Sequence, residues 1–145
     1  MNAVSAAEFE VAGQRYRSAR MNVFDQQTVA SKLGGVLLLM GDGSEAKTPP
    51  TPEAFVRAFC ALSGDMRKQD SDLVMNLCLA GVTRAQPGDL GYAKVMTPVP
   101  GVLAFEDINL NEMLLIVWHV LKQHRIPDFF TEPRSPSKDK TVAGT

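Results

Sequence analysis

The chain has 145 residues, of which 45% are hydrophobic and 21% charged, a size and balance typical of one globular domain with a buried core. The chain has 15 Lys and Arg residues and 16 Asp and Glu residues, so its formal net charge is -1. It therefore has no overall positive charge that would attract nucleic acid or an anionic membrane. The longest wholly apolar run, residues 36–40, is far below the roughly 20 residues of a membrane helix. The N-terminus lacks the charged and apolar segments of an export signal. We therefore expect a soluble cytoplasmic protein with no membrane partner.

A β-hairpin is predicted near the N-terminus, because apolar and charged residues alternate around a Gly13-Gln14 turn. On its two arms, Phe9, Val11 and Tyr16 alternate with Glu10, Arg15 and Arg17.

A first helix is predicted to follow, with Asn22 as its N-cap and Asp25 in its first turn, where the helix dipole favours a carboxylate. Its expected buried stripe is Phe24, Gln27, Ala30, Leu33 and Leu37. Residues 41–50 have the composition of a surface loop.

Two further helices are predicted in the middle of the chain. The first begins at Thr51-Pro52, since proline suits the first helical position, and its expected apolar face is Phe55, Val56, Phe59, Cys60 and Leu62. The second spans residues 65–80. Both Cys60 and Cys78 are expected to be buried thiols, and we favour this over a disulfide. Residues 84–101 are rich in Pro and Gly, which predicts an irregular segment with at most a short strand near residues 92–96.

The last predicted helix begins after Asn109, which forms a capping-box pattern with Glu112. From Leu110 it is apolar on almost every side, so it must be surrounded by its own domain or by a partner. We therefore expect an α+β fold, mainly helical, with an N-terminal β-hairpin packed on a small bundle of three to four helices. Residues 8–130 should form a single globular domain, between a flexible N-terminus at 1–7 and a disordered tail at 131–145.

A protein-binding surface is the functional feature that the composition favours. Phe129 and Phe130 follow Pro127 at the edge of the expected tail, where two adjacent phenylalanines are hard to bury together, and exposed they would add to an apolar patch. The candidate protein-binding residues are Met113, Leu114, Val117, Trp118, Leu121, Phe129 and Phe130.

The sequence supplies no recognisable catalytic, cofactor or metal site. His119 and His124 are five residues apart, which does not place them on one helix face as a paired metal site requires, and neither cysteine lies in a C-x-x-C pair. The loop at residues 41–48 contains Gly, Lys and Thr but not in the order of a phosphate-binding loop. We therefore expect no cofactor and no enzymatic activity.

The order of these features resembles the tail assembly chaperones of tailed bacteriophages. The resemblance is carried by the Phe9 to Tyr16 hairpin, the Arg20 to Gln27 run into the first helix, the segment at residues 72–82, the Asp107-Ile108-Asn109-Leu110 run and the closing Pro127 to Phe130.

This resemblance implies a non-enzymatic protein of the infected host cell's cytoplasm, absent from the finished virion. It would bind the tape measure protein and help to recruit tail tube protein around it, with possible self-association. An apolar groove built from residues 110–121 and the Phe129-Phe130 pair could take the apolar stripe of a tape measure helix.

Two other functions stay open. The protein could be a structural adaptor, such as a minor tail or neck protein that is retained in the virion. It could also be a small enzyme or nucleic-acid regulator that uses Arg15, Arg17 and Arg20, although its near-neutral charge makes nucleic acid an unlikely partner.

Overall fold

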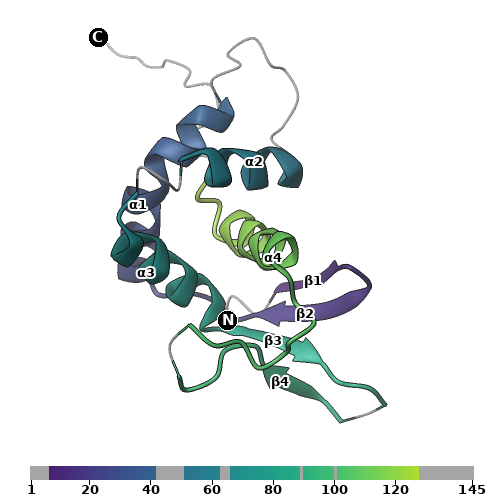
Figure 1. The fold of residues 1–145 in the computed structure, drawn as a ribbon. Coiled ribbons are helices and arrows are strands. Elements are labelled where there is room, and N and C mark those ends of the chain that lie inside the picture. Colours follow the sequence, from purple (N-terminus) through teal and green to yellow (C-terminus); the bar gives the residue numbers. More distant parts are fainter. Residues whose placement is uncertain (1–6, 42–50, 63–65, 89, 100, 128–145) are drawn as a thin grey trace, which may run out of the picture.

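The computed structural model describes residues 7–41, 51–62, 66–88, 90–99 and 101–127, with the backbone alone at 38–41. It confirms an α+β fold in which four helices accompany a four-stranded antiparallel sheet (Figure 1). The expected flexible N-terminus at 1–7 falls largely outside the described residues, and the expected tail at 131–145 lies wholly outside them, as do Phe129 and Phe130.

The predicted hairpin is confirmed as β1 (Ala7–Val11) and β2 (Gln14–Ser18). Its turn lies one residue earlier than expected, at Ala12-Gly13, because Val11 pairs with Gln14. Both turn residues have positive φ, 53° and 81°, as the tight two-residue turn between twisted strands requires. This register places Val11 and Tyr16 on the buried face of the hairpin.

The sheet extends beyond this hairpin in the order β1-β2-β3-β4. Strand β3 (Val82–Ala85) was not predicted, whereas β4 (Tyr92–Lys94) lies within the expected segment. β3 pairs antiparallel with β2 and with β4. It escaped detection because its inward residues are Val82 and a charged residue, Arg84, which breaks the apolar alternation that marks a strand.

Helix α1 (Val23–Gly41) begins as predicted, since the backbone N–H of Asp25 donates to Oδ1 of Asn22 at 2.9 Å. Leu33 and Leu37 of the predicted stripe are fully buried, but Phe24 is 79% exposed, and Val29, which the stripe did not include, is fully buried. At about 100° per residue, the nine-residue separation of Phe24 and Leu33 places them about 180° apart around the helix. One stripe could not hold both side chains.

Helices α2 (Pro52–Leu62) and α3 (Lys68–Leu79) confirm the two mid-chain helices. The hydroxyl of Thr51 accepts from the Ala54 N–H at 3.1 Å, which caps α2. Cys78 is buried as predicted, but Cys60 is exposed. Its position lies about 140° around α2 from the buried Phe55, so the expectation of burial was wrong there.

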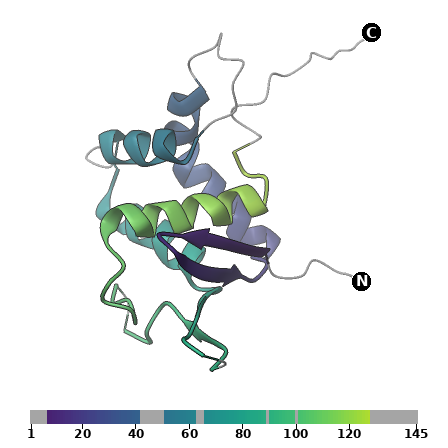
Figure 2. The same cartoon turned by 90° about the vertical axis from the view of Figure 1, so that its right-hand side faces the viewer.

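Helix α4 (Leu110–Gln123) lies at the centre of the molecule, between α2 and the β1 edge of the sheet in both views (Figures 1 and 2). Its predicted capping box is present: the Glu112 N–H donates to Asn109 Oδ1 at 2.8 Å, and the Asn109 N–H donates to Glu112 Oε1 at 3.3 Å. Trp118 stacks on Phe55 of α2, with ring centroids 5.4 Å apart. The chain's own elements therefore surround this apolar helix.

Candidate functional site

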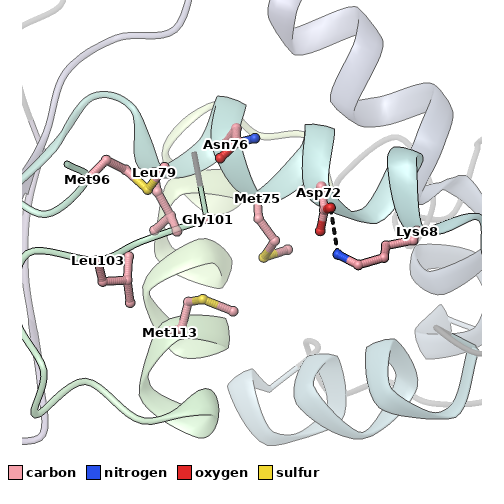
Figure 3. Close-up of a pocket in the computed structure, with 9 residues that line it drawn as sticks. All are labelled: Lys68, Asp72, Met75, Asn76, Leu79, Met96, Gly101, Leu103 and Met113. Carbon is pink, nitrogen blue, oxygen red and sulfur yellow. Dashed lines mark hydrogen bonds and ion pairs between the residues drawn. The ribbon is translucent and has the colours of Figure 1, made fainter. Parts of the chain in front are cut away.

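A cavity of about 350 Å³ opens between α3, the loop after β4 and the first turns of α4. Figure 3 shows three methionine side chains gathered around it, one from each of these segments. We call it the methionine groove, and its lining residues are Lys68, Asp72, Met75, Asn76, Leu79, Met96, Gly101, Leu103 and Met113.

Helix α3 forms the long wall of the groove. Lys68, Asp72, Asn76 and Leu79 recur at three- and four-residue spacing, so they lie along one side of the helix. The ammonium of Lys68 donates to Asp72 at 2.8 Å. The two ends of this row are 11 residues apart, or about 17 Å along the helix axis, which gives the groove the length of roughly three helical turns.

A second cavity of about 460 Å³ continues the methionine groove past Asn76 and Met96, which line both spaces. Its other walls are Ala80, Lys94, Thr97 and Pro98. The accessible surface therefore has an apolar middle with charged groups at both ends: the Lys68–Asp72 ion pair at one and exposed Lys94 at the other.

The wall opposite α3 is a folded-back segment, residues 95–99 and 101–104, which we call the arm. Met96 and Leu103 form an isolated β-bridge, and the Ala104 N–H donates to the Val95 carbonyl at 2.7 Å. At the tip, the hydroxyl of Thr97 lies 2.8 Å from the Val102 carbonyl. Val99 and Val102 are 58% and 47% exposed, so the arm adds apolar surface beside the groove.

An ion pair holds the segment after the arm against the sheet. Arg84 of β3 donates two hydrogen bonds to the carboxylate of Asp107, each 2.8 Å long, and its guanidinium lies 4.5 Å from the centre of the Phe105 ring. The hydrogen bond between them lowers the pKa of Asp107 and raises the pKa of Arg84. Because Arg84 is buried and fixed in the sheet, this two-point contact positions the chain between the arm and α4.

The structure separates the predicted protein-binding residues of α4 into two groups. Leu114, Val117, Trp118 and Leu121 are at most 1% exposed, so in the folded chain they pack in the core. Met113 is half-buried and lines the methionine groove. The sequence could not show that α2, α3 and β1 pack against α4 and cover most of its surface.

Met75 and Met96 were missed because they come from segments that the sequence does not connect. Met75 looked like one apolar residue of a helix, and Met96 one residue of an irregular loop. No spacing signal could have joined them to Met113.

The two histidines have structural environments. His119 stacks on Phe9 with ring centroids 4.6 Å apart, and burial, with a smaller effect of Lys122, lowers its pKa. Nε2 of His124 accepts from the Met21 N–H at 2.8 Å, while Nδ1 lies 2.9 Å from the Val120 carbonyl. Within the described part of the chain, no three His, Cys, Asp or Glu residues cluster as a metal site would need.

The arginines of the hairpin are engaged with a carboxylate. Arg17 lies 2.9 Å and Arg15 3.4 Å from Glu8, and the hydrogen bond from Arg17 is the main cause of a lowered pKa for Glu8. The guanidinium of Arg17 also lies over the Tyr92 ring, 4.2 Å from its centre. One carboxylate thus pairs with both arginines and offsets part of their charge on this face of the sheet.

A family model described as "Phage tail assembly chaperone protein, TAC" matches residues 12–136. The chain belongs to the phage tail assembly chaperone family. This membership implies protein partners in tail assembly, which agrees with a site that offers apolar surface. No curated protein and no solved structure matches the chain. None of the helices in the described ranges combines the length and hydrophobicity of a membrane span.

Proposed function

We propose that this chaperone binds the tape measure protein of a tailed phage in its methionine groove and thereby promotes assembly of tail tube protein around it. It acts without catalysis in the host cytoplasm and leaves before the virion is complete. A tape measure is a long helical chain whose apolar stripe would aggregate before the tube covers it. A groove that shelters one stretch of that stripe at a time would prevent this.

The observation that carries the proposal is the presence of Met75, Met96 and Met113 around one open groove. Methionine is unbranched and polarisable, so its side chain adapts to partners of different shape, and such residues are common on binding surfaces that accept many sequences. A tape measure presents many non-identical helical turns. An adaptable lining suits it better than a rigid pocket.

The dimensions of the groove support a helical occupant. A wall of about 17 Å matches roughly 11 residues of a partner helix, and helices bind grooves through apolar side chains at i, i+3 or i+4, and i+7. Lys68, Asp72 and Lys94 stand at its ends, where they would form the polar rim usual for a protein interface. Phe129 and Phe130, which lie outside the described residues, remain candidates for a second apolar contact.

Calorimetric titration of the folded chaperone with the tape measure encoded beside it tests this proposal. We expect Met75→Lys and Met113→Lys each to weaken binding at least about tenfold, because a charge placed in an apolar contact must be desolvated. Leu90→Lys is the matched control, since Leu90 is 74% exposed and outside the groove. Equal affinity of all four proteins, with folding confirmed by circular dichroism, would rule out the groove as the binding site.

A chaperone differs from a retained adaptor in whether it is present in the finished virion. Quantitative mass spectrometry of purified virions should find this chain absent or far below the copy number of the tube protein. Stoichiometric recovery in virions would instead identify it as a structural tail component.

A further inference from the structure

Arg84 of β3 lies in the core although it carries a charge. It is 9% exposed, and it is the only charged residue that is buried in the described part of the chain. Its neighbours in the sheet are hydrophobic: Tyr16, its cross-strand partner on β2, and Val82 are at most 1% exposed. Taking a guanidinium out of water is costly, and apolar replacements of buried ion pairs are often equally stable or more stable. Stability alone therefore does not account for an arginine at this position.

Asp107, the partner of Arg84, lies at the surface. Its side chain is 61% exposed, so water screens the attraction between the two charges. The contact is instead well defined in geometry: two hydrogen bonds of 2.8 Å from one planar guanidinium fix both the position and the orientation of the carboxylate. The Phe105 ring lies against the same guanidinium, with its centre 4.5 Å away. One buried side chain thus holds the chain at Phe105 and at Asp107.

Both held residues belong to the linker, our name for residues 105–109 between the arm and α4. The linker contains no helix or strand. The arm continues from β4, whereas α4 packs on β1, at the opposite edge of the sheet (Figure 1). Leu103 at the end of the arm and Met113 of α4 both line the methionine groove. These two walls are therefore attached to opposite edges of the sheet, and Arg84 on β3 holds the linker that joins them.

We propose that Arg84 and Asp107 are positioning residues of the methionine groove, whose contact sets the spacing between its arm wall at Leu103 and its α4 wall at Met113. This inference rests on the proposed function of the groove. Neither Arg84 nor Asp107 lines the groove or its continuation, so they act on a bound helix only through the walls. Walls held at a fixed spacing need not be ordered when a helix binds, which reduces the entropy lost on binding.

Replacement of Arg84 by methionine tests this proposal in calorimetric titrations with the tape measure. Arg84→Met removes the buried charge instead of leaving it unpaired, and the exposed carboxylate of Asp107 stays in water, so the chain should keep its stability. We expect the dissociation constant to rise at least about threefold, as for residues that act on a site without touching the ligand. Arg84→Lys, which keeps the charge without the two-point fork, should show the same loss and serves if the methionine variant does not fold.

Two comparisons separate positioning from a general loss of stability. Leu114→Ala destabilises the core and yet should bind normally, because Leu114 does not line the groove. Glu106→Gln is the matched control for Asp107→Asn, since it removes the charge of the adjacent exposed residue. Asp107→Asn should weaken binding in the wild-type chain and have no further effect in the Arg84→Met chain. Unchanged affinity of the folded Arg84→Met and Arg84→Lys chains, or independent losses from the two positions, would overturn the proposal.

The free chain provides a readout that needs no tape measure. The methyl signals of Met96 on the arm and Met113 on α4 should shift in the Arg84→Lys chain, because the spacing of the two walls changes, and should stay in place in the Glu106→Gln chain. Unshifted signals would contradict the positioning role even if no tape measure binds. A wild-type chain that does not bind the tape measure, while these signals shift, would refute the groove proposal and leave the positioning of the walls intact.

Discussion

Replacement by alanine should have different effects at the adjacent residues Met113 and Leu114 of α4. Leu114→Ala should mainly lower stability, whereas Met113→Ala should mainly weaken binding to the tape measure. Leu114 is fully buried, and Leu114→Ala removes roughly three methyl or methylene groups at about 0.8 kcal/mol each, with an added cost for the cavity left behind. We expect a loss of about 3 kcal/mol in the free energy of unfolding. In a chain of this size that corresponds to a melting temperature about 10 °C lower. Met113 is only half-buried, so Met113→Ala should cost about 1 kcal/mol.

Urea denaturation followed by circular dichroism measures both values, with unchanged slopes as the sign that only stability has moved. Binding to the tape measure should show the reverse order: Met113→Ala weakens it about tenfold, whereas Leu114→Ala leaves it nearly unchanged at temperatures where the variant is folded. Equal losses of stability in the two variants would refute the separation of α4 into a buried side and a groove side.

Three further outcomes follow from the structure. Asn109→Ala removes the capping box and should lower the free energy of unfolding by about 1 kcal/mol in urea denaturation; an unchanged midpoint would show that the cap does not stabilise α4. Because Arg84 lowers the pKa of Asp107, their pair stabilises the fold above the ordinary aspartate range near pH 4 and is lost as the pH falls through the lowered value. Melting curves should therefore show a steeper decline in acid for the wild type than for Asp107→Asn, and parallel declines would contradict this. Burial raises the pKa of Cys78 to about 12, so a thiol reagent at pH 8 should label exposed Cys60 quickly and Cys78 only on unfolding; rapid labelling of both in the folded chain would be inconsistent with the described core.

Local signals in the sequence identified most elements of this fold, because each depends on neighbouring residues. The alternation around Tyr16, the Asn22 cap and the Asn109–Glu112 box all act over a few positions, and the structure contains each of them. Which side of a helix is buried depends instead on the elements that pack against it. The local pattern therefore wrongly placed Phe24 and Cys60 on buried faces, because neighbouring helices and strands cover other sides of their two helices.

The candidate site was harder to predict than the fold. The high hydrophobicity of α4 indicated that it must be covered, but it could not distinguish cover by its own domain from cover by a partner. The three groove methionines lie on α3, the arm and α4, and the Arg84–Asp107 contact that positions the arm's end joins residues 23 positions apart. Only the tertiary arrangement brings these side chains together.

Methionine methyl resonances give the most direct test of the groove as the binding site for the tape measure. The chain contains seven methionines, which can be labelled with ¹³C at the methyl group and assigned by single substitutions. On titration with the tape measure, the signals of Met75, Met96 and Met113 should shift together, while that of Met21, which is 8% exposed and outside the lining of the methionine groove, should stay in place. Formation of the complex with these three signals unmoved would contradict the proposed function.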